Sequence, residues 1–261
     1  MARGALIGAM CSRFTLTATP GETATLLGLA ALDGFPPRYN IAPTQPILVA
    51  IGGSEDRPDA GRPGRTGLLV RWGFIPGWVK DLSGFPLMFN AASETAAQKN
   101  SFSAALRYRR CLVPASGYYE WRRDGRGRPQ QAYFLKPRSG GPIAFAGLME
   151  TWLSPDGSEI DTAAILTTTA NATLRPIRER MPVVLAPRDF PRWLDCRNHD
   201  AGNVADLLRP APASLFTAVP VSNRVNRVAD TSPEIQTPIA LAEKPPGGDK
   251  IADDPDQPSL F

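Results

Sequence analysis

The sequence is poor in histidine and cysteine, and it has no long hydrophobic run. His199 is the one histidine among 261 residues, and the three cysteines stand at positions 11, 111 and 196. Their spacing indicates neither a zinc site nor a disulfide framework. No apolar stretch approaches the roughly 20 residues of a membrane helix, and the apolar patch within residues 1–9 is too short for a signal peptide. We therefore expect a cytoplasmic protein with no membrane partner, no metal and no cofactor.

Charge is unevenly distributed along the chain. The formal net charge is +4, and residues 243–261 hold five acidic residues against two lysines, a balance of −3. The rest of the chain therefore carries +7. A basic body suggests a polyanionic partner, although on charge alone a solvated surface is the better explanation. The Pro, Gly and Asp content of residues 243–261 predicts a disordered acidic tail.

Short strand patterns dominate the chain between these ends. Alternation and β-branched content predict strands over residues 14–19, 46–51, 67–74, 110–114, 117–122, 131–136, 143–149, 161–169, 182–185 and 215–221. Helical patterns fit residues 20–31, 101–108, 188–195 and 203–209, and residues 38–45 are expected to form a loop. Many short strands with few helices between them argue against a doubly wound parallel sheet. We expect one α+β domain with a curved, largely antiparallel, barrel-like sheet and a few peripheral helices.

Polar or reactive residues interrupt four otherwise apolar segments. These segments are MCSRF (10–14), NAASET (90–95), GYYEW (117–121) and IRERMP (177–182). Asn90 and Glu120 stand where a buried strand would usually carry an apolar side chain. Glu120, between Tyr119 and Trp121, is either half exposed by strand alternation or held in a dry site with a raised pKa.

Eight motifs, in order along the chain, resemble those of the SOS response-associated peptidase family, the abasic-site processing proteins. They are MCSRF, PPRYNIAPTQ, RWGFIPGW, FNAASET, RCLVPASGYYEW, IAFAGLMETW, ILTTTAN and RMPVVL. The resemblance implies a catalytic domain over residues 10–235, preceded by an extension over residues 1–9. It also implies a monomer that acts on abasic sites in single-stranded DNA during the DNA damage (SOS) response, near the nucleoid or replication fork.

The resemblance assigns the central chemistry to Cys11, as an N-terminal cysteine. A free α-amine has a pKa of about 7.7–8.0, so part of it is neutral and nucleophilic at neutral pH. The amine would form a Schiff base with the abasic aldehyde, and the thiol would then close a thiazolidine, which is a covalent DNA–protein cross-link. An internal cysteine has no such amine. We therefore expect either a true start at Met10 or removal of residues 1–10, with associated autoproteolytic, peptidase and lyase activity.

Three further residues complete the catalytic set that the resemblance implies. Asn90 would hold the reacting centre, because its amide both donates and accepts hydrogen bonds, and Glu120 would move protons. Arg178 stands where the family usually has a histidine, and an arginine cannot act as a general base at neutral pH. Ala92 stands where many relatives have an arginine, so one phosphate contact is either missing or supplied elsewhere.

The resemblance and the basic and aromatic side chains together predict a DNA-binding surface. Its expected members are Arg13, Pro43, Thr44, Arg71, Trp72, Phe74 and Thr167. Aromatic side chains stack on the bases of single strands, and core packing is the alternative role for Trp72 and Phe74.

Two other functions use the same residues. An N-terminal-nucleophile peptidase or amidase would use the Cys11 amine as the base for its own thiol. A non-covalent single-stranded DNA binding module would follow if Cys11 is never N-terminal.

The last five residues suggest a second partner. Gln257-Pro258-Ser259-Leu260-Phe261 resembles the Q-x-x-L-F peptide by which bacterial proteins dock on the DNA sliding clamp. Leu and Phe would fill an apolar pocket while Gln hydrogen-bonds at its edge. A chance terminus is the alternative.

Overall fold

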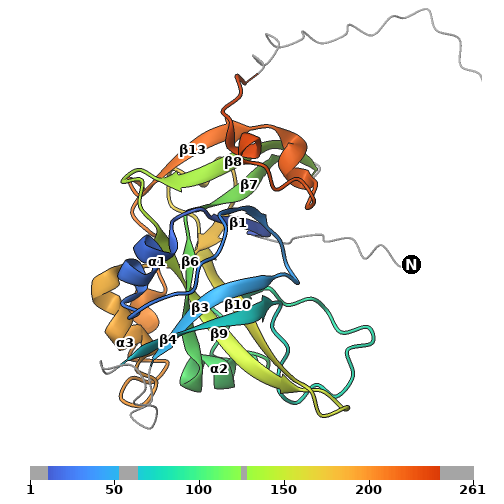
Figure 1. Ribbon diagram of the computed structural model, residues 1–261, viewed down its shortest axis with the longest axis vertical. Coiled ribbons are helices and arrows are strands. Elements are labelled where there is room, and N and C mark those ends of the chain that lie inside the picture. The colour runs from blue at the N-terminus through green and yellow to red at the C-terminus, as the bar shows by residue number, and fades with distance from the viewer. Residues whose placement is uncertain (1–10, 53–63, 125–127, 242–261) are drawn as a thin grey trace, which may run out of the picture.

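A closed ring of strands forms the core of the computed structural model, which describes residues 11–52, 64–124 and 128–241 (Figure 1). The ring consists of β3 (Pro46–Gly52), β4 (Arg65–Trp72), β6 (Arg110–Ala115), β9 (Ile143–Leu153) and β10 (Glu159–Thr169). Strand order β10-β4-β3-β6-β9 is closed by a direct β9–β10 pairing, and within the ring only β10–β4 is parallel. The expected α+β class with a largely antiparallel, barrel-like core is confirmed.

Three short strands extend the ring. They are β5 (Asn90–Ala92), β11 (Arg180–Pro182) and β12 (Val184–Leu185). β5 and β11 pair with β10, and β12 pairs with β9. A single strand was expected over residues 182–185, and this is wrong. Val183 lies between two ring strands, because its N–H donates to Leu166 O and its carbonyl accepts from Ala146 N–H.

A second, fully antiparallel sheet lies across one end of the ring (Figure 1). Its members are β1 (Arg13–Leu16), β2 (Arg38–Ile41), β7 (Gly117–Arg123), β8 (Pro129–Pro137) and β13 (Phe216–Val221), in the order β13-β8-β7-β1-β2. β6 runs into β7 through Ser116 alone, so one continuous stretch of chain belongs to both sheets. Phe14 joins their cores, since its ring packs edge-on against Trp72 at 5.1 Å and Phe145 at 6.2 Å.

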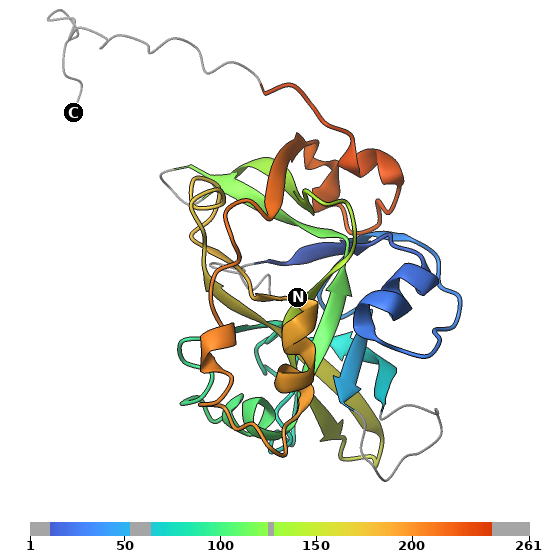
Figure 2. The same cartoon turned by 90° about the vertical axis from the view of Figure 1, so that its left-hand side faces the viewer.

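The helices are short and lie outside the sheets (Figures 1 and 2). They are α1 (Pro20–Leu27), α2 (Ser103–Tyr108) and α3 (Phe190–Leu194), with 3-10 turns at Pro187–Asp189, Ala205–Leu207, Asn223–Asn226 and Pro233–Gln236. Among the described residues, no helix has the length and apolar character needed to cross a membrane.

α1 shows why a helix expected to reach Ala31 ends earlier. Thr19 and Glu22 form a capping box at its start, with Pro20 in the first turn. Gly28 ends it in the left-handed region, at a φ of 67°, which costs glycine little. A side chain at this position would also come within 2.8 Å of Arg65 Nη1.

Two other expectations fail for lack of local signal. Residues 38–45 were expected to form a loop, but Arg38–Ile41 pairs with β1, from a distant part of the sequence. Residues 203–209 were expected to be helical, but only the 3-10 turn Ala205–Leu207 forms there. The sequence of such a short segment shows neither which strand it will pair with nor how long a helix it will form.

Candidate active site

Cys11 lies two residues before the start of β1, the strand that pairs with β7 in the second sheet. Register pairs Arg13 with Tyr119 across β1 and β7, so Glu120 of β7 comes next to the residues that precede β1. The Cys11 backbone N–H donates to Glu120 Oε1 at 2.7 Å. Cys11 is 1% exposed in a chain that carries residues 1–10, and its φ of 37° is in the left-handed region.

Asn90 reaches the same cysteine from the ring. β5 runs parallel to β10 with Asn90 opposite Ile165. Asn90 Nδ2 donates to the Cys11 carbonyl oxygen at 3.4 Å. Cys11 is thus held on both sides of its backbone, at the nitrogen by a carboxylate and at the carbonyl by an amide.

Arg178 closes the site from the turn between β10 and β11. Its Nε lies 3.7 Å from Glu120 Oε2, and both side chains are largely buried. The two carboxylate oxygens therefore face different groups: Oε1 accepts from Cys11, and Oε2 faces a guanidinium. An arginine here can stabilise negative charge but cannot take a proton at neutral pH.

The surroundings of Glu120 and Cys11 shift the pKa values of both. Burial raises the pKa of Glu120 to about 7, against the lowering effects of the Cys11 N–H bond and of Arg178. Burial, and then the charge of Glu120, raise the pKa of the Cys11 thiol well above its ordinary value. Glu120 is thus in the dry site with a raised pKa, not on an exposed face. The thiol is protonated at neutral pH, so it is a poor first nucleophile.

The structure brings together the four residues expected to be catalytic: Cys11, Asn90, Glu120 and Arg178. In the ranges that the structure describes, no three His, Cys, Asp or Glu side chains come together as a metal site would require. Burial raises the pKa of Glu120 to about 7, so this carboxyl could both donate and accept a proton at neutral pH, and it could do so at the Cys11 nitrogen only if that nitrogen were a free amine rather than an amide.

Comparison with known proteins shows which family the chain belongs to. The profile described as SOS response associated peptidase (SRAP) matches residues 10–228. The chain belongs to the SRAP family. It is 37% identical to the abasic site processing protein YoqW of Bacillus subtilis, over 87% of this chain and 98% of YoqW. It is 30% identical to the abasic site processing protein HMCES of Gallus gallus, over 79% of this chain and 68% of HMCES.

Solved structures share the SRAP fold of this chain. A crystal structure of a Bacteroides thetaiotaomicron protein aligns with a TM-score of 0.76 at 23% identity, covering 88% of this chain and all of that one. A phage-related protein of Bordetella bronchiseptica aligns with a TM-score of 0.63 at 26% identity, covering 81% of this chain and 94% of that one.

Three residues expected to contact DNA lie inside this SRAP domain. Trp72 and Phe74 are 0% and 1% exposed. The Trp72 indole donates to Phe89 O at 2.9 Å, and Phe74 packs on Phe102 at 5.2 Å. Thr167 is buried too, and its hydroxyl donates to Ala91 O at 3.4 Å. The expectation that these side chains meet DNA is wrong, because both rings are enclosed by the core and the hydroxyl is turned inward.

The other four expected contacts lie at or near the surface. Arg13 is half buried and donates to Ser12 O and Asn226 O. Thr44 is exposed and Pro43 half buried. Arg71 Nη1 donates to Gly73 O at 2.7 Å. These four positions remain candidates for DNA contact, since each is partly or fully exposed.

Trp78 is an aromatic side chain that the sequence reasoning did not single out. It is 61% exposed, on the connection that leads from β4 to β5 and hence to Asn90. Phe85 supports it edge-on at 6.4 Å. The signal was present in RWGFIPGW, whose last aromatic residue precedes a polar stretch rather than a strand.

Proposed function

We propose that this protein covalently captures abasic sites in single-stranded DNA through Cys11 at the N-terminus of the mature chain. The observation that carries the proposal is the 2.7 Å contact between the Cys11 nitrogen and Glu120 Oε1 in a buried setting. A carboxyl that titrates near neutral pH is placed on the atom that would have to gain and lose protons. The names of the relatives, abasic site processing proteins, support the choice of substrate.

The chemistry proceeds in two balanced steps. The α-amine adds to the aldehyde carbon of the opened sugar, and the carbinolamine loses water to give a C=N bond. The thiol sulfur then adds to that carbon, a C–S bond forms, and the thiol proton ends on nitrogen. The product is a five-membered thiazolidine, and one water is released for each strand captured.

The four site residues have separate tasks in this sequence. Glu120 takes the proton that the α-amine nitrogen must lose as it adds to the aldehyde, and it gives a proton to the carbinolamine hydroxyl, which leaves as water. Asn90 fixes the Cys11 carbonyl, so that amine and thiol face the same carbon. Arg178 favours the ionised form of Glu120 and does not itself transfer protons. Lyase activity by β-elimination would depend on Glu120 for its base.

The nitrogen of Cys11 must be a free amine for this chemistry. While residue 10 is attached, that nitrogen is an amide and cannot form a Schiff base. We propose that the active form begins at Cys11, either because translation starts at Met10 and Met10 is removed, or because residues 1–10 are cleaved off. Peptidase activity at the Met10–Cys11 bond would serve the second route.

Intact-mass spectrometry tests the proposal directly. Protein beginning at Cys11 is incubated with a single-stranded oligonucleotide that contains one abasic site. We expect a species whose mass is the sum of both partners less one water. Cys11→Ala retains the amine, so it should give a stable adduct only after borohydride reduction of the Schiff base. No adduct with the unaltered protein, with or without borohydride, would contradict the proposal.

Two alternative functions predict different results in the same assay. A peptidase or amidase would cleave an amide substrate and leave the abasic strand unmodified. A non-covalent DNA-binding module would bind the strand equally well with Cys11 or Ala at position 11 and form no adduct under borohydride.

We further propose that the C-terminus docks on the bacterial sliding clamp, which would bring the protein to replication forks during the SOS response. The motif, Gln257–Phe261, lies outside the described residues and is carried by the sequence alone. Deletion of residues 257–261 should abolish binding to purified clamp in a pull-down while leaving adduct formation intact. Equal clamp binding by the truncated and full-length proteins would remove this part of the proposal.

A further inference from the structure

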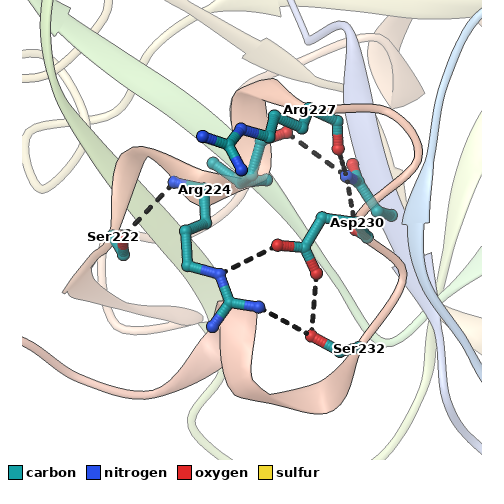
Figure 3. A network of polar contacts seen from close by, with 7 residues as sticks. Ser222, Arg224, Arg227, Asp230 and Ser232 are labelled. Carbon is teal, nitrogen blue, oxygen red and sulfur yellow. Dashed lines mark hydrogen bonds and ion pairs between the residues drawn. The ribbon is translucent and has the colours of Figure 1, made fainter.

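Residues 222–232 form a braced loop after β13. Asn40, buried in β2, donates through Nδ2 to three carbonyl oxygens of this loop, those of Val225, Arg227 and Asp230, at 3.0–3.2 Å. A second brace involves side chains: Arg224 Nε donates to Asp230 Oδ2 at 2.9 Å, and Ser232 Oγ to Asp230 Oδ1 at 2.8 Å (Figure 3). The loop is therefore preorganised, and a ligand would not have to order it.

The braced loop touches both strands that carry the Cys11 centre. Arg13, two residues after Cys11, donates to Asn226 O at 3.5 Å. Trp121, the residue after Glu120, donates through its indole to Asn226 Oδ1 at 2.8 Å. The loop therefore lies beside the residues that flank Cys11 and Glu120, where one arm of a DNA strand with its abasic sugar at Cys11 can reach it.

Positive charge collects along this side of the site. β1, β7 with its hairpin as far as Arg128, and residues 222–232 contain six arginines, among the described positions, and three acids. Each acid already faces an arginine: Glu120 faces Arg178, and the other two pairs are Asp124–Arg128 and Asp230–Arg224. The excess positive charge of these segments therefore comes from the four arginines outside these pairs, which are Arg13, Arg122, Arg123 and Arg227.

Arg227 is the exposed member of that excess on the braced loop. Its backbone is fixed, because its carbonyl accepts from Asn40 and its N–H donates to Arg224 O at 3.0 Å. Its side chain has no carboxylate partner within the described part of the chain, and Figure 3 shows its guanidinium turned away from Asp230. A rigidly mounted, exposed guanidinium suits a phosphate, which it can bind through two parallel hydrogen bonds.

We propose that Arg227 and the braced loop bind a phosphate of the DNA strand flanking the abasic site, on one side of the lesion only. The inference rests on the proposed function for its substrate class, single-stranded DNA. It adds a backbone contact from the C-terminal part of the domain, on a segment that none of the eight motifs behind the family resemblance includes. Such a contact places the strand without reading its sequence.

The test separates binding from capture by using an oligonucleotide with a tetrahydrofuran abasic analogue, which has no aldehyde. Affinity is measured by fluorescence anisotropy over a tenfold range of salt for the unaltered protein, Arg227→Gln and Arg188→Gln. Arg188 is the matched control, an exposed arginine just before α3. Affinity falls as salt rises, and in Arg227→Gln the slope of log affinity against log salt should be less steep by about 0.7, because one phosphate contact is lost. The advantage of the unaltered protein over Arg227→Gln should therefore shrink about fivefold across that salt range.

Shortening the oligonucleotide locates the contact. With the arm on one side of the lesion removed, the unaltered protein and Arg227→Gln should bind alike, whereas removing the other arm should leave their difference intact. Equal slopes for all three proteins, or a difference that neither truncation removes, would overturn the inference. Adduct formation by the unaltered protein on an aldehyde-bearing strand is measured in parallel. No adduct together with a persistent Arg227 effect would contradict capture and leave the strand-binding inference standing.

Discussion

The Cys11 centre and its surroundings use charged groups in opposite ways. At the centre, burial raises the pKa of Glu120 to about 7, although the Cys11 N–H and Arg178 both act to lower it. On the braced loop, Arg227 is exposed and has no acidic partner among the described residues. The first arrangement makes proton transfer easy, and the second attracts a polyanion.

A similar contrast between buried and exposed side chains separates two tryptophans that are only six residues apart. Trp72 is enclosed and donates its indole N–H to Phe89 O, whereas Trp78 is 61% exposed. Enclosed rings stabilise the fold, and exposed rings can stack on bases. Residue type alone does not distinguish these two roles. The backbone path after Trp72 decides which ring is enclosed and which is exposed.

Replacing Glu120 should have the largest effect, because it removes the group on which the centre depends. We expect Glu120→Gln to slow adduct formation by about 10²- to 10⁴-fold, since positioned acid–base groups contribute factors of that size. Rapid-quench electrophoresis of adducts, with protein beginning at Cys11, measures the rate. An unchanged rate would mean that proton transfer at Cys11 does not involve this carboxyl.

The same variant should change stability in a pH-dependent way. Burial raises the pKa of Glu120 from 4.5 to about 7, so the folded state holds this proton more tightly than the unfolded state does. The free energy of unfolding of the unaltered protein, relative to that of Glu120→Gln, should therefore fall as pH rises from about 4.5 to about 7. The fall should be at most about 1.4 kcal/mol for each pH unit in that range. Urea unfolding of both proteins at several pH values measures this, and a constant difference would contradict it.

The two tryptophans should respond to alanine in opposite assays. Trp72→Ala should lower the free energy of unfolding by about 3–5 kcal/mol, as expected for an enclosed ring. Trp78→Ala should leave unfolding nearly unchanged and weaken single-stranded DNA binding by about 1–3 kcal/mol, the usual value of one stacked base. Urea unfolding and fluorescence anisotropy on both variants provide the test. Undiminished DNA affinity in Trp78→Ala would show that this ring does not stack on the bases.

Arg178 should have the smallest and most specific effect. Because its charge lowers the pKa of Glu120, Arg178→Gln should move the pH midpoint of adduct formation upward, whereas Arg178→Lys should keep the midpoint close to that of the unaltered protein. The pH–rate profile reports this midpoint independently of folding. A slower rate with an unmoved midpoint in Arg178→Gln would assign Arg178 to holding the strand instead.

Sequence reasoning predicted the domain class and the four central residues, but not how they interact. The long strands β9 and β10 have enough alternation to be visible locally, whereas β2 exists only because β1 pairs with it. The motifs pointed to Glu120 and Arg178, but the 3.7 Å between them depends on how β7 meets the turn before β11. Likewise, nothing near Asn40 in the sequence shows that it braces a loop almost two hundred residues later.

The backbone torsion of Cys11 has a consequence for the order of events at this terminus. A φ of 37° in a residue with a side chain costs about 1–2 kcal/mol, and that cost exists only while a peptide bond precedes Cys11. Once the residue is terminal, its amine turns freely about the N–Cα bond and the strain disappears. Under the proposed cleavage before Cys11, re-forming the Met10–Cys11 bond would have to restore this strain, so the strain would favour the cleaved form.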